Sequence, residues 1–127
     1  METIEVEPWN VFISNCPSRQ IFERISDRWT SLVLMALEDG TLRFSELKRK
    51  VEGVSQKMLT QTLRGLERDG LVTREVFPTV PVTVEYTLTR LGTSLLGAVQ
   101  QIRTWAYANI EEIDAAREQY DRRSVAA

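Results

Sequence analysis

The fold is decided by residues 43–88, which read RFSELKRKVEGVSQKMLTQTLRGLERDGLVTREVFPTVPVTVEYTL. The opening of this stretch, SELKRKV, predicts a short helix that Ser45 caps and that ends at Glu52-Gly53. A second helix is predicted from Ser55, a good N-cap, to Asp69-Gly70, where glycine can take the left-handed conformation that ends a helix. The side chains that this helix turns inward recur at helical spacing: Met58, Leu59, Thr62 or Leu63, and Leu66.

Two alternating runs follow the second helix. Residues 71–77 and 82–88 alternate with period two, which predicts two strands. The gap from Pro78 to Pro81 cannot supply a full set of ladder donors, so it predicts a turn. Helix, tight turn, helix and hairpin, in this order, indicate an α+β, mainly α, winged helix-turn-helix domain. As in winged helices generally, residues 41–43 can add a short strand beside the hairpin.

The outward face of the second helix is the candidate DNA-reading surface. Its side chains are of the types that reach base edges and phosphates, because glutamine can pair with adenine and arginine with guanine or phosphate. The alternative is an ordinary solvated helix face. The predicted DNA contacts are Gln56, Lys57, Thr60, Gln61 and Arg64 on this face, with Arg43, Ser45, Ser55, Thr79 and Thr83 around it.

Charge is distributed unevenly along the chain. The net charge is −2, which by itself argues against binding to nucleic acid. Residues 41–76, however, hold eight basic and five acidic side chains and have a net charge of +3, so the rest of the chain has −5. The acidic residues therefore lie mainly in the tails, away from the proposed DNA face. A solvated surface with uneven charge is the simpler interpretation of the same numbers.

A family resemblance rests on particular residues of this stretch. Residues 53–92, GVSQKMLTQTLRGLERDGLVTREVFPTVPVTVEYTLTRLG, resemble the HxlR-type bacterial transcriptional regulators, as does Cys16-Pro17 followed by Asp27-Arg28-Trp29. The phrase S-x-x-M-L-T-x-x-L-x-x-L-x-x-D-G-L-V-x-R within it is long and specific. The resemblance implies a winged-helix protein that binds double-stranded DNA and controls transcription. Members of the family often have a basic residue near Thr83, whereas residues 77–83 here have no charge, which weakens the expectation of an electrostatic contact by the wing.

Residues 1–15 predict an N-terminal arm. Its apolar residues, Trp9 and Phe12 among them, are too many for a free tail, so the arm packs either on a partner subunit or on its own domain. A helix opens at Cys16-Pro17, because proline is favoured in a first helical turn. Asp27 is a plausible N-cap for the next helix, whose residues 29–37 are apolar nearly all round and predict a core element.

Cys16 has two interpretations. At a helix N-terminus, unpaired N–H groups and the helix dipole favour a thiolate, so Cys16 is a candidate redox or electrophile sensor, a role that the resemblance implies for part of the family. The alternative is a small buried residue, because free cysteine is often simply buried. The chain has one cysteine, so no resolving thiol exists within it.

A long C-terminal helix is predicted over residues 91–120. Apolar residues recur along it every three or four positions, and at 1.5 Å per residue it would be roughly 45 Å long. This is more than one small domain can cover, so the helix is expected to pack on a second subunit, with residues 117–127 fraying. The predicted dimer interface comprises Trp9, Phe12, Leu95, Val99, Ile102, Trp105, Ile110 and Ile113.

Length and composition exclude several classes of protein. The 127 residues predict one domain, with an arm (1–15), a winged-helix core (16–90) and a dimerisation helix (91–120). No run of 18 apolar residues exists, so no membrane span is expected. With no histidine and one cysteine, the chain lacks the residues for a Cys/His zinc site or a Ser-His pair, so neither an enzyme nor a bound metal or cofactor is predicted. The acidic N-terminus and the single cysteine point to the cytoplasm.

These observations predict a homodimeric DNA-binding regulator of transcription, a repressor that occupies an inverted-repeat operator. A signal at Cys16 or a small effector bound between the subunits would change the separation of the two recognition helices. The alternative is a winged-helix module that binds another protein and has no salt-sensitive affinity for DNA. A third interpretation, a protein that binds a small molecule and has no DNA activity, lacks any motif of its own.

Overall fold

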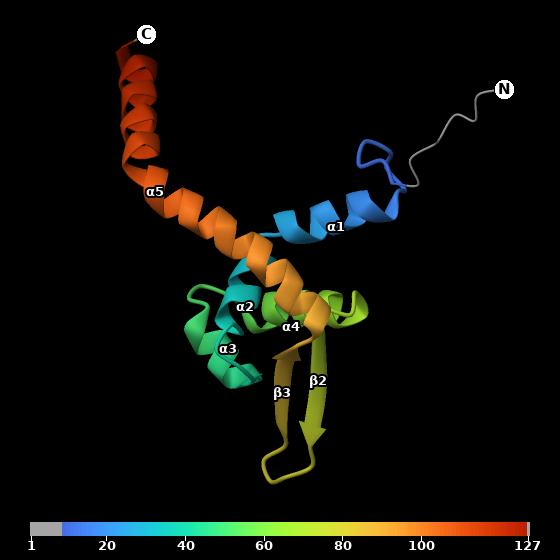
Figure 1. Cartoon of the computed structure of the whole chain (residues 1–127). Helices are drawn as coiled ribbons and strands as arrows, with labels where there is room; N and C mark the ends of the chain where they lie inside the picture. The colour runs from blue at the N-terminus through green and yellow to red at the C-terminus, as the bar shows by residue number, and fades with distance from the viewer. Residues whose placement is uncertain (1–8, 127) are drawn as a thin grey trace, which may run out of the picture.

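The computed structural model describes residues 9–126 of the chain. In chain order its elements are α1 (Pro17–Ser26), α2 (Thr30–Ala36), β1 (Leu42–Arg43), α3 (Phe44–Lys50), α4 (Gln56–Arg68), β2 (Val72–Phe77), β3 (Thr83–Leu88) and α5 (Arg90–Ala126) (Figure 1). This is a mainly helical α+β fold in which α3 and α4 form the helix-turn-helix and β2–β3 the wing. The predicted fold class is therefore confirmed.

The sheet follows the alternation of the sequence. It has the strand order β1-β3-β2, and all its pairs are antiparallel. The wing pairs from Val72 opposite Leu88 to Phe77 opposite Thr83, within one residue of the predicted runs. The short β1 pairs with β3, with Leu42 opposite Tyr86. The wing turn covers the Pro78–Pro81 gap, where the prolines have no N–H to donate.

Local capping fixes both ends of α4. At its start, the Ser55 hydroxyl oxygen accepts the N–H of Met58 at 3.1 Å. At its end, Gly70 has a φ of +75°, and the N–H groups of Gly70 and Leu71 donate to the carbonyls of Glu67 and Leu66. This is a Schellman motif, in which glycine supplies the left-handed residue. The predicted boundaries of the recognition helix are confirmed at both ends.

The core lies where α2, α3 and α4 meet the sheet and the first turns of α5. Its fully buried side chains are leucine, valine and threonine: Val33, Leu34, Leu37, Leu47, Leu59, Leu63, Leu66 and Thr30. The inward face of α4 is as predicted, with Leu59, Leu63 and Leu66 buried and Met58 packed against the core. Removing the apolar side chains of these helices and the sheet from water is the main contribution to the stability of the folded domain.

Two predicted caps are wrong. Asp27 does not cap α2, which begins three residues later, with Trp29 at the N-cap position. The Asp27 backbone is still extended after α1, and its carboxylate accepts the hydroxyl of Thr30 at 3.2 Å instead. Ser45 does not cap α3, because this helix begins at Phe44 with Arg43 as its N-cap. There the Glu46 carboxylate accepts the Arg43 backbone N–H at 2.9 Å.

Two helices leave the compact part of the molecule. In Figure 1, α1 and the far half of α5 diverge on the side opposite the wing. With 37 residues, α5 is roughly 55 Å long and continues past the predicted end at residue 120. Within the predicted frayed segment, an i,i+4 pair joins Arg122 to Glu118 at 2.6 Å, and such pairs support an exposed helix. Across residues 9–126, no helix has the length and apolar character needed to span a membrane.

Candidate nucleic-acid interface

The exposed face of α4 holds the predicted reading side chains. Ser55, Gln56, Lys57, Gln61 and Arg64 are exposed and Thr60 is half-buried. The helix periodicity causes this arrangement, because the same turns place leucines in the core. Ser55 precedes α4, so five of these residues belong to the helix itself: Gln56, Lys57, Thr60, Gln61 and Arg64. Their side chains face solvent and are available to a partner, and the packing of the helix on the core fixes their positions.

Donor capacity on this face differs from residue to residue. The Thr60 hydroxyl donates to the Gln56 carbonyl at 2.8 Å, so its proton is used within the helix and its oxygen remains an acceptor. Arg64 has no carboxylate within ion-pair distance among residues 9–126. Its guanidinium can therefore offer its N–H groups to a base edge or to a phosphate.

A second group of predicted residues meets at the base of the wing. Arg43, Ser45 and Thr83 line one depression of about 320 Å³ between the start of α3 and β3. Thr83 is about 40 positions from Arg43 and Ser45 in the chain, and the pairing of β1 with β3 brings it close to them. The Arg43 guanidinium lies 4.0 Å from the Glu85 carboxylate and is more than half exposed, so this weak surface pair leaves it free to reorient.

The tip of the wing is uncharged and partly apolar. The Thr79 hydroxyl donates to the Pro81 carbonyl at 2.8 Å, so its proton is engaged inside the turn. Val80 and Val82 beside it are exposed. Contacts from this tip to a phosphate would depend on backbone N–H groups and on the oxygens of Thr79 and Thr83, which agrees with the weak electrostatic role expected for an uncharged wing.

Cys16 lies at the N-cap position of α1, as the sequence predicts. Only 8% of the residue is exposed. Its Sγ accepts the backbone N–H of Asn10 at 3.2 Å and lies 3.0 Å from the Ser18 Oγ. The hydrogen bond from the Ser18 hydroxyl, helped by backbone N–H groups, outweighs desolvation and lowers the pKa of the Cys16 thiol to about 7. A thiol with a pKa near neutrality is partly ionised at neutral pH, and the thiolate is the reactive form.

The predicted dimer residues fall into two groups. Trp9, Phe12, Ile102, Trp105 and Ile110 are exposed, Phe12 to 85% and Trp105 to 60%, while Ile113 and Leu95 are half-buried. The structure corrects this set at Val99, which is 2% exposed and packs in the core of its own subunit. The apolar stripe of α5 thus covers its own domain first and becomes exposed further along.

Residues that the sequence did not single out complete the sites. Asn10 and Ser18 hold the Cys16 sulfur, and only the position of Ser18, two residues after the cysteine, could have indicated this. Arg24 of α1 donates to Asp69 at the end of α4 at 2.8 Å, across 45 residues of chain. No local sequence pattern predicts a pair at that separation.

The HxlR-like helix-turn-helix profile matches residues 24–114, which run from the end of α1 through α2, the helix-turn-helix and the wing to the first two thirds of α5. The chain belongs to the HxlR-like family. It is 43% identical to the HTH-type transcriptional regulator YtfH of Escherichia coli over 115 residues, 91% of each chain. It is also 40% identical to the HTH-type transcriptional regulator YodB of Bacillus subtilis over 92 residues, 72% of this chain and 82% of YodB.

Solved structures of HxlR-like and related regulators have the same fold. The transcriptional regulator YtfH from Salmonella typhimurium superposes with a TM-score of 0.82 at 45% identity, covering 87% of this chain and 98% of that one. The redox regulator HypR in its oxidised form superposes with a TM-score of 0.67 at 39% identity, covering 74% and 97%. These relatives are transcriptional regulators, a class of proteins that are not enzymes.

Proposed function

We propose that this HxlR-like protein is a homodimeric repressor that binds an inverted-repeat operator through the exposed face of α4. The observation that supports the proposal best is the capped, core-packed helix with Gln56, Lys57, Gln61 and Arg64 on its open side. Two-fold symmetry in a dimer requires two-fold symmetry in the site, so the half-sites are expected about one helical turn apart. A repressor acts by occupying that site.

A single arginine tests this assignment. Replacing Arg64 with alanine is expected to weaken operator binding 10- to 100-fold, about 1–3 kcal/mol, and to relax the base preference at one position of each half-site, because the guanidinium offers several donors to a base edge. The matched control is Arg117→Ala, which removes the same charge from the exposed far part of α5. Binding selection followed by titration of a labelled operator, at fixed salt, measures both effects.

Two results would contradict the proposal. Equal losses in Arg64→Ala and Arg117→Ala would show that only net charge matters. Selection that returned direct repeats, or no enriched motif, would exclude the inverted-repeat operator. A winged helix that binds only a protein predicts no salt-dependent DNA affinity, whereas phosphate contacts give affinity that falls steeply with salt. A salt titration on genomic fragments therefore separates the two functions.

A regulatory role for the Cys16 thiol is a second proposal. It rests on the hydrogen bonds of the sulfur and on the lowered pKa of the thiol. It also rests on the similarity of this chain to the redox regulator HypR and to YodB, which was solved after diamide treatment. With one cysteine in the chain, oxidation by diamide must join two copies of Cys16 or join Cys16 to an added small thiol. Either product replaces the thiolate and changes the contacts at the start of α1.

Diamide with glutathione is expected to release the wild-type protein from its operator and to leave Cys16→Ser bound. The thiolate reacts, so the rate of modification should rise with pH around a midpoint of about 7, the pKa of the folded thiol. In Ser18→Ala the midpoint should move upward, because the hydrogen bond that stabilises the thiolate is lost. Mass spectrometry follows the modification and operator titration follows the release. Equal responses of wild type and Cys16→Ser would make Cys16 a packing residue.

A further inference from the structure

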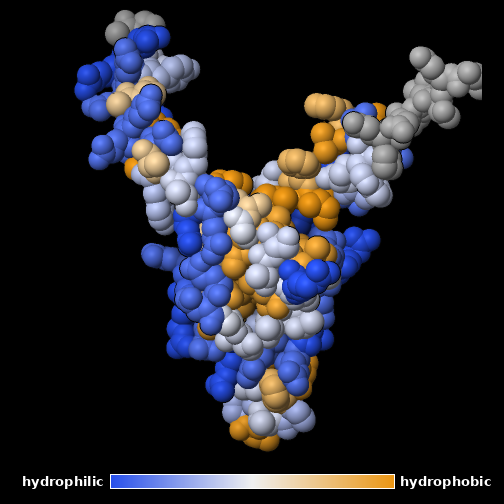
Figure 2. All heavy atoms as spheres, in the orientation of Figure 1, coloured by the Kyte–Doolittle hydropathy of each residue, from blue (hydrophilic) through white to orange (hydrophobic). Residues whose placement is uncertain are grey.

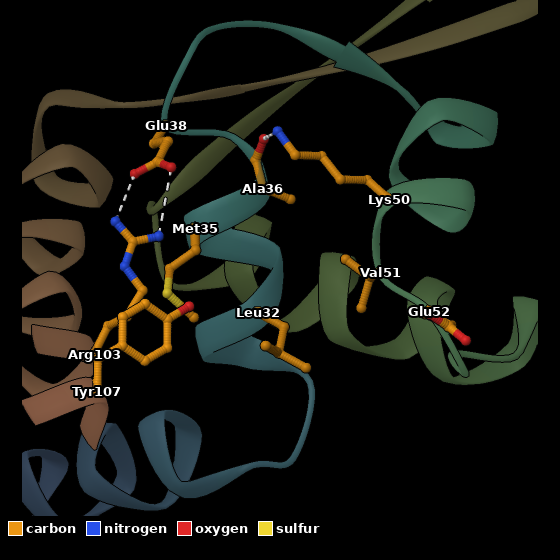
Figure 3. A pocket seen from close by; sticks show the side chains of 9 residues that line it. All are labelled: Leu32, Met35, Ala36, Glu38, Lys50, Val51, Glu52, Arg103 and Tyr107. Carbon is orange, nitrogen blue, oxygen red and sulfur yellow. Dashed lines mark hydrogen bonds and ion pairs between the residues drawn. The ribbon is translucent and has the colours of Figure 1, made fainter. Parts of the chain in front are cut away.

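A cleft of about 370 Å³ lies between α2, the end of α3 and α5. Figure 3 shows Met35 and Leu32 of α2 between two walls, one formed by Glu38, Arg103 and Tyr107, the other by Lys50, Val51 and Glu52. Its volume is in the range of small-molecule sites. We propose that this cleft binds a small organic monoanion, a carboxylate on a flat apolar body, as an effector.

The α5 wall is electrically neutral. The Arg103 guanidinium donates to both oxygens of the Glu38 carboxylate, at 3.5 and 3.2 Å, and the Gln100 amide donates to the same carboxylate at 3.0 Å. These bonds, from Arg103 first and then Gln100, lower the pKa of Glu38 and keep it ionised. Arg103 and Glu38 therefore satisfy each other, and this wall offers little net charge to a ligand.

The opposite wall has a cation whose hydrogen-bond partner is neutral, and its charge also helps to lower the pKa of Glu38 across the cleft. The Lys50 ammonium donates to the carbonyl oxygen of Ala36 at 3.1 Å, at the C-terminal end of α2. Among residues 9–126, no carboxylate lies within ion-pair distance of Lys50. An ammonium has three N–H donors, so two remain for an anion. In Figure 3 the Glu52 carboxylate lies on the far side of Val51 from the Glu38–Arg103 pair, and Glu52 is exposed to solvent.

The space between the walls is apolar. Ala36 and Val51 are buried, Met35 is half-buried, and Leu32 and the ring of Tyr107 are exposed at the mouth. A thioether and an aromatic ring adapt well to a flat ligand. The lining has two cations and two carboxylates, and Arg103 is already paired with Glu38, so Lys50 is left for one negative charge and a polyanion such as a nucleotide would add charge that the lining cannot balance. One carboxylate at Lys50 with an apolar body over Met35 and Leu32 matches the lining.

The position of the cleft would allow a bound ligand to affect the orientation of the DNA-reading helix α4. Lys50 to Glu52 form the end of α3 and the turn that leads to α4, whereas Arg103 and Tyr107 belong to the helix that leaves the domain. A ligand held between them would alter the angle between the helix-turn-helix and α5. This consequence rests on the proposed function, because only in a dimer on an operator does that angle set the separation of two recognition helices.

Methionine methyl resonances provide a local test without DNA. The chain has methionine at positions 1, 35 and 58. Of the two that lie within residues 9–126, Met35 lines the cleft and Met58 does not. Titration of methyl-labelled, full-length protein with phenylacetate is expected to shift the Met35 resonance saturably, with a dissociation constant on the order of 1 mM, which suits a ligand of about ten heavy atoms. Met58, on α4, serves as the internal reference. The neutral phenylacetamide should bind at least tenfold more weakly.

Variants at Lys50 assign the site. Lys50→Gln should weaken phenylacetate binding at least tenfold and Lys50→Arg should retain it, while Lys48→Gln, two residues earlier on the exposed side of α3, should bind as wild type. Circular dichroism confirms that each variant is folded. Three results would each overturn the site. The Met35 resonance would stay unmoved, the amide would bind as tightly as phenylacetate, or Lys50→Gln would bind as wild type. Because no DNA is present, failure here is separate from failure of operator binding; unchanged operator affinity at saturating phenylacetate would overturn its role as an effector site.

Discussion

Substituting glutamate for both Trp105 and Ile110 is expected to convert the protein from a dimer to a monomer and to weaken operator binding by a factor of 100 or more. Both side chains are exposed in the subunit, so the change does not remove core packing. In a dimer they would be buried, and burying unpaired carboxylates is costly. A monomer presents one recognition helix in place of two and loses the effective concentration that links the half-sites, a factor of about 10²–10⁴.

The surfaces left uncovered in the subunit support this expectation. No residue of α1 is buried, although Ile21 and Phe22 give it an apolar side. Figure 2 shows apolar surface gathered where α1 and α5 diverge, with hydrophilic residues along the outer flank of α5. Exposed apolar surface of this kind on neighbouring helices is typical of an interface. A second copy fits best, because the stripe on α5 continues without a break from the part that its own core covers.

The matched control adds the same two charges to the polar side of α5. At 100° per residue, Thr104 and Ala115 lie on the side of the helix away from Ile102 and Ile113, and neither is a same-face neighbour of Trp105 or Ile110. Thr104→Glu with Ala115→Glu should therefore remain dimeric. Sedimentation velocity at the same protein concentration compares the variants, and operator titration follows. A Trp105→Glu, Ile110→Glu protein that sedimented with the wild type would show that the subunits meet elsewhere.

Local signals made most of the winged helix predictable. The Ser55 cap, the Asp69-Gly70 end and the alternation on either side of Pro78–Pro81 each act within a few residues, so the sequence contains them in full. The caps predicted for α2 and α3 were wrong because α2 begins three residues after Asp27 and α3 begins one residue before Ser45. The Asp27 carboxylate accepts the Thr30 hydroxyl, and at the start of α3 the Glu46 carboxylate accepts the backbone N–H of Arg43.

The candidate sites were predictable only where one element contains them. The face of α4 follows from helical periodicity. The Lys50–Arg103 cleft and the Arg24–Asp69 pair join residues about 50 positions apart, and no periodicity reveals them. Val99 shows that helical periodicity alone can also assign a residue to the wrong surface. Its spacing fits the apolar stripe of α5, yet only the packing of this helix on its own core decides that Val99 is buried while Ile102, less than one turn later, is exposed.

Gly92 in the first turn of α5 is expected to tolerate no side chain. A Cβ there would lie 1.9 Å from the Leu71 carbonyl oxygen, which is backbone and cannot rotate away. That oxygen is itself held, because it accepts the Thr89 N–H at 3.1 Å, while the Thr89 hydroxyl donates to the Gly70 carbonyl and accepts the Gly92 N–H. Thr89, the residue before α5, is thus bonded directly to the two residues that precede β2. Gly92→Ala must push the two backbones apart.

The expected cost of Gly92→Ala is about 3 kcal/mol or more, at the upper end of overpacking changes, even though alanine favours helix by about 1 kcal/mol. This corresponds to a fall in Tm of roughly 10 °C for a chain of this size. The control is Gly97→Ala in the same helix, where a Cβ meets nothing within 4 Å, so its Tm should stay unchanged or rise. Thermal unfolding followed by circular dichroism at one protein concentration compares them. Equal Tm values for the two variants would mean that α5 can shift along β2, and the close crossing at Gly92 would then not fix the angle at which α5 leaves the domain.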